Sequence, residues 1–341
     1  MQTSPENIRF GVKPPALVDP FGRAVTYIRV SVTDRCDLRC TYCMPSEHMQ
    51  WLPKAELLSV DELLRVVRLA VSAGIEEVRL TGGEPLLHPH VVDIVAGIAS
   101  LPTAPTVTLT TNGVHLAPVA QSLVDAGLQR FNISLDTLDR DRFKQLTRRD
   151  ELGAVLQGIA AAKATGIRPI KINSVLMAGV NDDEAPELLA WAIAEGLQLR
   201  FIEEMPLNID HHWSRSNYVS TDDVITSLRA RFTLTELPRD PHSPAFLMGV
   251  DGTAQTVGFI SSVSRPFCGG CDRVRLTADG QFRNCLFARE ESDLRSLLRK
   301  DATDEQLLQR MLECVQAKKR GHGIDSDDFV QPERSMHAIG G

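Results

Sequence analysis

The sequence predicts an α/β protein built as a partial (β/α)6 TIM-type barrel, with a smaller C-terminal domain closing its open side. Two observations lead to this prediction. Six short β-rich segments, mostly separated by helical patterns, occupy the chain up to about residue 235, and the pattern then becomes loop-rich with proline and glycine breaks. Strands that alternate with helices indicate right-handed crossovers and a parallel sheet. Because a closed barrel needs eight such units, six predict an open one.

The elements follow one another in a regular order. Strands are expected near residues 26–32, 76–80, 106–111, 130–135, 168–176 and 197–203, and helices near 59–73, 89–100, 117–126, 151–165, 183–195 and 303–318. The first helix opens with Ser59 and Glu62 at capping-box spacing. We expect an N-terminal leader at 1–25, a barrel domain at 26–235 and a C-terminal domain at 236–341.

Composition excludes several classes of protein. The 341 residues are 43% hydrophobic and 24% charged, as in globular proteins, and the formal charge of −7 argues against a nucleic-acid or membrane-surface partner. No apolar run is long enough for a membrane span, and the N-terminus lacks the apolar core of a secretory signal. A cytoplasmic location is therefore expected. In a reduced compartment an odd number of cysteines, seven here, favours metal ligands over disulfides.

The predicted strands alternate polar and apolar residues. In a parallel sheet whose outer face packs on helices, the polar face must line the interior. That face would carry Arg29, Arg79 and Lys171. Buried cations are costly unless an anion accompanies them, so the alternation predicts a lumen for a polar, anionic ligand. An antiparallel sheet with one wet face is the alternative, which the intervening helices disfavour.

Polar or glycine-rich segments follow four of the strands, where a barrel places its working residues. They are "TGGEP" at 81–85, "TTNG" at 110–113, "SLD" at 134–136 and "IEEM" at 202–205. Gly82 and Gly83 allow a ligand to approach the main chain, although "GGEP" alone is also typical of a tight turn before a helix.

Two groups of three cysteines carry the chemistry. Cys36, Cys40 and Cys43 are spaced C-x3-C-x2-C, and Cys268, Cys271 and Cys285 are spaced C-x2-C-x13-C. Structural zinc needs four ligands, so each trio would need a histidine, His48 for the first or His242 for the second. Three thiolates on an iron–sulfur cluster instead leave one iron open for chemistry, and we favour this reading. The seventh cysteine, Cys314, is expected in the core.

Arg273 and Arg275 flank Val274 in "CDRVRL", so on a strand both guanidinium groups face the same way, beside the second trio. Forked, permanently charged donors suit phosphate oxygens. A solvated surface pair is the ordinary alternative, but the lumen cations favour a polyphosphate.

Together these motifs resemble known families. CxxxCxxC after a first strand, with Tyr42 before the last cysteine and a later "GGEP", resembles the radical S-adenosylmethionine superfamily. With the second trio, "CDRVRL" and the terminal "IGG", the chain resembles the GTP 3′,8-cyclases of molybdenum-cofactor biosynthesis, the MoaA family, from about residue 25 to its last glycine.

The resemblance implies a set of ligands. Two [4Fe-4S] clusters would use the two trios, S-adenosyl-L-methionine would bind at the first, and GTP would lie between them. The implied cofactor contacts are Tyr42, Gly83, Ser134 and Met205, and the implied GTP contacts are Arg29, Arg79, Thr110, Lys171, Arg273, Val274 and Arg275. Arg273, Arg275, Gly340 and Gly341 would support catalysis, the two glycines through a tail that enters the site. Without the resemblance, Met205 reads as core and the tail as a frayed end.

The resemblance also implies a reaction and its partners. A 5′-deoxyadenosyl radical would remove the ribose C3′ hydrogen of GTP, and C3′ would then join guanine C8. An electron donor and a downstream pyranopterin-forming enzyme are implied partners, with the chain a monomer or homodimer. The competing hypotheses are a radical enzyme that modifies a peptide and a zinc-stabilised binding module.

Overall fold

Six parallel strands form the centre of the fold and follow the chain order. The computed structural model describes residues 15–44, 51–207, 213–214, 218–324, 326 and 329–340. The strands are β1 (Tyr27–Ser31), β2 (Glu77–Thr81), β3 (Thr106–Thr111), β4 (Arg130–Ser134), β5 (Lys171–Val175) and β6 (Gln198–Ile202), each paired in parallel with the next. All six predicted strands are confirmed.

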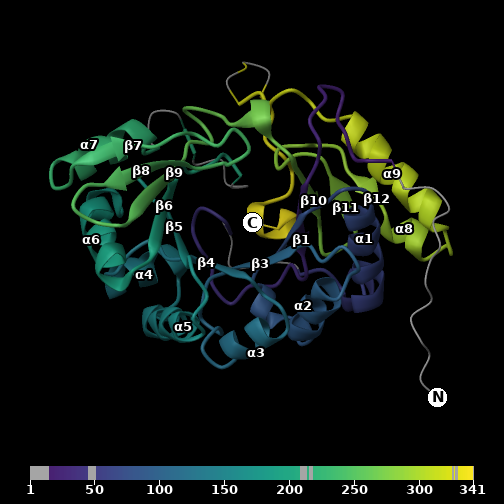
Figure 1. Cartoon of the computed structure of the whole chain (residues 1–341), viewed down its shortest axis with the longest axis horizontal. Coiled ribbons are helices and arrows are strands. Elements are labelled where there is room, and N and C mark those ends of the chain that lie inside the picture. The colour runs from purple at the N-terminus through teal and green to yellow at the C-terminus, as the bar shows by residue number, and fades with distance from the viewer. Residues whose placement is uncertain are drawn as a thin grey trace.

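Helices pack outside these strands (Figure 1). They are α1 (Val60–Ser72), α2 (Val91–Ala99), α3 (Ala120–Asp125), α4 (Arg140–Thr147), α5 (Leu152–Ala164), α6 (Ala185–Glu195) and α7 (Thr221–Arg229), with 3-10 turns η1 (Lys54–Glu56), η2 (Pro85–Leu87) and η3 (Asp182–Glu184). The capping box of α1 forms, since the Ser59 hydroxyl accepts the Glu62 amide and the Glu62 carboxylate accepts the Ser59 amide. The sequence reading did not include α4 and α7, which are short and largely polar.

The C-terminal part adds strands to both edges of this sheet. Its elements are β7 (Leu234–Glu236), β8 (Phe246–Val250), β9 (Thr256–Ile260), η4 (Cys268–Gly270), β10 (Arg273–Leu276), β11 (Gln281–Arg283), β12 (Ser292–Asp293), α8 (Arg295–Leu298), α9 (Asp304–Gln316) and α10 (Met336–Ile339). β10 pairs in parallel with β1, and β9 pairs in parallel with β6. The resulting order is β12-β11-β10-β1-β2-β3-β4-β5-β6-β9-β8-β7. The partial barrel with a C-terminal addition is confirmed.

The loop-rich expectation for the region after residue 235 was wrong where β8 and β9 form. Glycine was read there as a breaker, but Gly258 lies inside β9 for a steric reason. A Cβ atom at this position would stand 3.0 Å from the Cγ atom of Arg200 on the neighbouring strand. The glycine therefore makes room for a long side chain that points into the barrel.

The apolar residues of the strands face the helices and form the core. Ile28, Val78 and Leu109 are among those with no exposed surface. Residues that precede β1 join this core as well, since Leu17 and Val25 are only 1% exposed and the Leu17 amide donates to the Ala73 carbonyl. The boundaries at residues 25 and 235 stay predictions.

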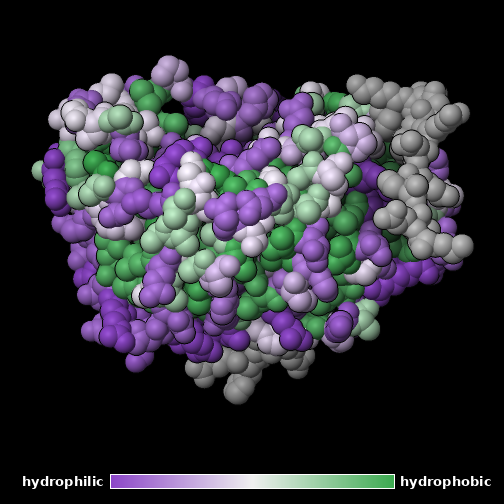
Figure 2. Space-filling model, turned by 60° about the horizontal axis from the view of Figure 1, so that its bottom comes forward, coloured by the Kyte–Doolittle hydropathy of each residue, from purple (hydrophilic) through white to green (hydrophobic). Residues whose placement is uncertain are grey.

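The outer surface mixes hydrophilic and hydrophobic residues. On the face turned forward in Figure 2, hydrophobic residues gather towards the middle, between hydrophilic residues at the margins. Among the described residues, no helix has the length and apolarity needed to cross a bilayer.

Candidate active site

A cavity of about 560 Å³ occupies the interior of the barrel and is lined by the polar faces of its strands. The predicted cations Arg29, Arg79, Lys171, Arg273 and Arg275 all line it, as does Thr110. Val274 does not, because it points to the opposite face of β10 and is fully buried in the core. A contact from its side chain to a substrate finds no support in this geometry.

The strand register brings the arginines together. Arg29 on β1 lies opposite Arg79 on β2 and opposite Arg275 on β10. The ring of Tyr27, two residues before Arg29 on β1, has its centroid 5.4 Å from the guanidinium group of Arg79 and 5.3 Å from that of Arg273. The Tyr27 ring thus offers a cation–π surface to both.

Sequence reasoning missed two cations and one carboxylate in this lumen. Arg130 and Arg200 line the cavity. Glu77 accepts from Arg130 and, at 2.9 Å, from Arg79, so it neutralises part of the local charge. The alternation of polar and apolar residues could have predicted both arginines, since Arg130 and Arg200 share the polar face of their strands with Asn132 and Gln198.

The charges of the lumen depress one another's pKa values. Burial, followed by repulsion from Arg200, Arg130 and Arg79, lowers the pKa of Lys171 to about 7. Burial is also the leading cause that lowers the pKa of Arg29 and of Arg200 to about 10. An anion that binds beside these groups stabilises their charged forms, so the lumen favours a ligand with several negative charges.

Buried polar atoms in the cavity also lack partners. In the part of the chain that the structure describes, Thr110 Oγ1, Asn132 Oδ1 and Asn173 Oδ1 are buried without a hydrogen bond. Unpaired buried polar groups are uncommon in native proteins and are costly unless a ligand or water satisfies them. They fit a polar ligand in the lumen.

The first cysteine loop lies against the end of β2, and two glycines permit this. A Cβ atom on Gly83 would stand 2.4 Å from the Arg35 carbonyl oxygen, and one on Gly82 would stand 2.7 Å from that of Thr33. The Gly83 amide donates to the Thr33 carbonyl at 2.8 Å. The "GG" pair therefore seats the loop that carries Cys36, in addition to lining the cavity.

Two buried carboxylates hold this end of the barrel. Glu84 accepts the Thr111 hydroxyl and the Asn112 amide, both at 2.7 Å, and burial raises its pKa to about 7. Asp136 accepts the Tyr42 hydroxyl at 2.7 Å, and burial raises its pKa to about 6. Tyr42 thereby ties the cysteine loop to the end of β4.

The residues predicted to contact the cofactor all reach the cavity. Tyr42, Gly83, Ser134 and Met205 line it from four separate segments of the chain. Met205 is partly exposed to the cavity, so the alternative reading of it as core is not what the structure shows.

The first cysteine trio also lines the cavity, and its thiols are free. Burial raises the pKa of Cys43 to about 12, with the neighbouring Cys36 thiol adding to the shift. Within the described residues, no three Cys, His, Asp or Glu side chains converge closely enough to hold one metal ion. Three free thiols on one loop, facing a cavity, are the donor set of an iron–sulfur cluster that keeps one iron open, so the trio fits such a cluster. His48 lies outside the described residues.

The second trio lies beside the same cavity. Its sequence neighbours Phe267, Asp272, Arg273 and Leu286 line the cavity, and all three thiols are partly buried and free. His242, the alternative fourth ligand, lies beside this loop, where its Nδ1 atom is hydrogen-bonded to the Gly270 carbonyl at 3.3 Å. Cys314 is buried in the core, as expected.

The C-terminal tail enters the barrel. The end of the chain lies in the middle of the ring of strands in Figure 1, where Met336 and His337 of α10 line the cavity. The Gly340 carbonyl accepts from Arg275. A Cβ atom on Gly340 would stand 2.9 Å from Thr81 Oγ1 and 3.0 Å from Ser31 Cβ, so the tail needs a glycine there. Gly341 lies outside the described residues.

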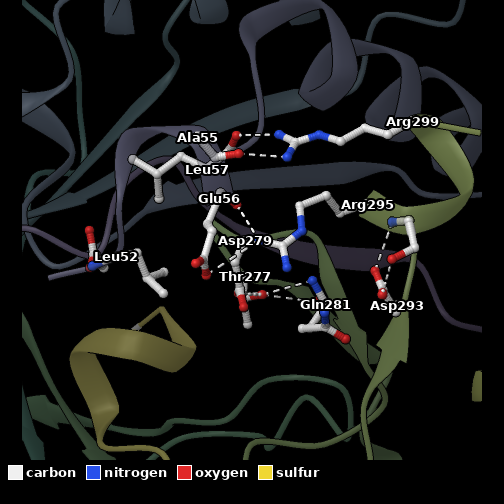
Figure 3. A network of polar contacts seen from close by, with 12 residues as sticks. Leu52, Ala55, Glu56, Leu57, Thr277, Asp279, Gln281, Asp293, Arg295 and Arg299 are labelled. Carbon is white, nitrogen blue, oxygen red and sulfur yellow. Dashed lines mark hydrogen bonds and ion pairs between the residues drawn. The ribbon is translucent and has the colours of Figure 1, made fainter.

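Figure 3 shows how the C-terminal part grips the segment that follows the first cysteine loop. Arg299 donates to the carbonyl oxygens of Ala55 and Leu57 at 2.6 and 2.9 Å. Arg295 donates to the Glu56 carbonyl at 2.6 Å. These three consecutive carbonyls are thus held by the two ends of α8.

Comparisons with known proteins agree with this site. Residues 30–192 match the family model of the Radical SAM superfamily, and residues 197–324 match that of Molybdenum Cofactor Synthesis C. The chain is 55% identical to the GTP 3′,8-cyclase of Streptomyces coelicolor over 95% of its own length and 96% of that relative. It belongs to the GTP 3′,8-cyclase family. The Mycolicibacterium smegmatis cyclase is 51% identical over 95% of this chain and 92% of that protein.

Solved structures agree on the fold. SuiB of Streptococcus suis superimposes with a TM-score of 0.59 over 90% of this chain and 69% of its own, at 13% identity. Its complex with S-adenosylmethionine gives 0.57 over 84% and 68%. At this identity the likeness speaks for the fold alone. Membership of the GTP 3′,8-cyclase family, with its radical SAM domain, implies an iron–sulfur cluster and S-adenosylmethionine as cofactors.

Proposed function

We propose that this chain converts GTP to (8S)-3′,8-cyclo-7,8-dihydroguanosine 5′-triphosphate, the first step of molybdenum cofactor biosynthesis. One observation carries the proposal: a single cation-lined cavity is lined by the first cysteine trio and by residues adjacent in sequence to the second trio. Family membership supplies the reaction, and the cavity offers the charges that a nucleoside triphosphate requires. The reaction joins C3′ of the ribose to C8 of guanine after the C3′ hydrogen is removed.

The cofactors supply the radical, and the chain supplies position. When bound at Cys36, Cys40 and Cys43, an iron–sulfur cluster provides the electron that cleaves S-adenosylmethionine to a 5′-deoxyadenosyl radical. Tyr42, Gly83, Ser134 and Met205 are proposed to hold S-adenosylmethionine beside it. Since these residues all line the cavity, they can fix the geometry of the cofactor there.

The cations are proposed to hold the triphosphate and ribose. Arg29, Arg79, Lys171, Arg273 and Arg275, with Thr110, form this set, and we add Arg130 and Arg200 because they face the same space. In the free protein these cations repel one another. Phosphate oxygens that lie among them would offset this repulsion, because each cation is attracted to the phosphates. Gly340, whose carbonyl accepts from Arg275, is proposed to complete the site.

The second trio, Cys268, Cys271 and Cys285, is proposed to hold another [4Fe-4S] cluster, with guanine as its ligand. The three free, partly buried thiols, whose sequence neighbours line the cavity, support this assignment. The electron donor, the downstream enzyme, the oligomeric state and the cytoplasmic location stay predictions.

Anaerobic reconstitution tests the proposal. Wild type should bind about eight iron atoms with matching sulfide, whereas Cys36→Ala and Cys268→Ala should each lose about four. GTP should raise the melting temperature and yield the cyclised product on reduction with S-adenosylmethionine. Colourless protein containing zinc, or thermal protection by a peptide and not by GTP, would contradict the proposal.

Arg273→Ala separates the substrate site from the cofactor site. We expect GTP affinity to fall by about tenfold or more, because a desolvated charge-assisted contact is lost. Cleavage of S-adenosylmethionine should continue, since Arg273 does not lie near the first trio in sequence or register. Unchanged GTP affinity would count against this assignment.

A further inference from the structure

We propose that Arg23, in the segment before β1, is a positioning residue for the second cysteine trio and its cluster. The inference rests on the proposed function, because it presumes that this trio binds a cluster. Arg23 lies outside both matched ranges, 30–192 and 197–324. The role that we propose for it follows from its hydrogen bonds to residues far away in the sequence.

The guanidinium group of Arg23 joins two remote segments through their carbonyl oxygens. Its Nη1 atom donates to Cys268 at 2.5 Å and to Arg320 at 3.1 Å, and its Nη2 atom donates to Lys319 at 3.0 Å. Its Nε atom donates to Asp19 at 2.5 Å. The Asp19 side chain is fully buried and that of Arg23 is 11% exposed, so the fork is held in place.

Residues 319–321, which Arg23 joins to Cys268 through hydrogen bonds, lie against that cysteine. A Cβ atom on Gly321 would stand 3.9 Å from Cys268 Sγ. The backbone amide of His322 hydrogen-bonds the Cys268 sulfur, so this segment also contacts the thiol itself. Arg23 therefore acts on Cys268 through the backbone carbonyl of that cysteine and through the segment that lies against its sulfur.

A second buried cation, Lys318, performs a similar task one segment away. Its Nζ atom donates to the carbonyls of Arg273 and Asn284 at 2.5 and 2.8 Å. It thus joins the strand after Cys271 to the residue before Cys285. Between them, Arg23 and Lys318 connect the two cysteine-bearing segments to residues 318–322. Outer contacts of this kind orient the ligands of a metal centre and tune it.

The test isolates the second centre. In a protein carrying Cys36→Ala, Cys40→Ala and Cys43→Ala, all bound iron belongs to the second trio. Arg23→Gln in this background should release iron to a chelator about tenfold faster or more, as outer-shell changes typically weaken metal binding by this order. Its reduction potential should become more negative, because a nearby positive charge is lost. Arg23→Lys should restore part of the potential and less of the retention, since it keeps the charge and loses the fork.

Arg65→Gln is the matched control. Arg65 also bridges distant segments, donating to Asp304 and to the Ala302 carbonyl, both at 2.7 Å, but it touches no cysteine-bearing segment. It should lower the melting temperature without changing iron release or potential. Equal release rates and potentials in Arg23→Gln and its parent would overturn the inference. Absence of iron from the parent would overturn the second cluster itself, and the inference with it.

Discussion

At the scale of residues, the most informative feature is the number of positively charged side chains that line one cavity. Seven of them line the cavity in the described part of the chain: Arg29, Arg79, Arg130, Lys171, Arg200, Arg273 and Arg275. The pKa of Lys171 is lowered to about 7, so this side chain can lose its charge near neutral pH. It therefore links the binding of an anion to the uptake of a proton.

We predict that GTP affinity falls as the pH rises from about 7.5 to 9. Bound phosphates raise the pKa of Lys171 back towards its usual value, so binding above pH 7 takes up a proton, and the affinity falls by up to about tenfold per pH unit. The triphosphate is already ionised in this range. Titration calorimetry in buffers of different ionisation enthalpy would measure the uptake.

Lys171→Arg provides the control, because arginine stays charged across this range. Its GTP affinity should be nearly independent of pH, with little proton uptake. A wild-type profile as flat as that of the variant would show that Lys171 is already protonated in the free protein.

At the scale of elements, the strand ends carry the site because the loops that follow them interlock. Glu84 joins the ends of β2 and β3, and Tyr42 joins the first cysteine loop to Asp136 after β4. The Gly82–Gly83 pair allows the cysteine loop to lie on the β2 end at backbone contact. Arg295 and Arg299, at the two ends of α8, then hold residues 55–57, which lie between the first cysteine loop and α1 in the chain (Figure 3).

Gly83→Ala should weaken the seat of the first cysteine loop. A Cβ atom 2.4 Å from a backbone carbonyl cannot be accommodated without moving the loop, so a cost of about 1–3 kcal/mol in the free energy of unfolding is expected, with loss of first-site iron. Gly153→Ala is the comparison: nothing lies within 4 Å of its Cβ position on α5, so it should stabilise by about 0.5–1 kcal/mol. Denaturant unfolding and iron counts measure both. Equal iron in the two variants would contradict this account.

Arg299→Ala should loosen residues 52–58. Its donations to the Ala55 and Leu57 carbonyls and, at 3.1 Å, to Glu62 are partly exposed, so we expect a loss of about 1 kcal/mol and faster hydrogen exchange in this segment. Arg310→Ala removes only an exposed ion pair with Glu313 at 3.6 Å and should cost less than about 0.5 kcal/mol. If exchange in 52–58 were the same in both variants, α8 would not be what holds the segment.

At the scale of the whole molecule, both ends of the described chain meet the barrel. Residues before β1 reach the second cysteine trio through Arg23, and the C-terminal tail passes into the lumen through Gly340. The C-terminal strands β9 and β10 extend the sheet at both edges. The site is therefore complete only when the first and last parts of the chain have both docked.

Gly340→Ala should abolish most of the cyclisation without unfolding the protein. Its φ of 89° and its contacts with Ser31 and Thr81 leave no room for a methyl group, so the tail would be displaced. Misplacement of this kind lowers turnover by about a hundredfold. Deletion of Gly340 and Gly341 should act alike. Gly323→Ala also has a positive φ, 70°, but open space around it, and should keep activity. Full turnover after the deletion would remove the tail from the mechanism.

The sequence by itself determined the local features of this protein. Strand alternation predicted the strands, their inward polar faces and three of the lumen cations, Arg29, Arg79 and Lys171, because side chains on a strand alternate between its faces wherever it lies. The spacing of Cys36, Cys40 and Cys43 indicated a cluster for a similar reason, since one short loop brings the three thiols together. Arg130 and Arg200 obeyed the same alternation and could have been included.

Only the tertiary structure decided which distant residues meet. Arg23 contacts a cysteine 245 positions away, and the Arg275–Gly340 contact spans 65. Glu84, Asp136 and Gly258 looked ordinary because their roles depend on partners from other strands. Such contacts depend on the register between strands and on the docking of loops, which follow from the packing of the whole chain and not from any short stretch of it.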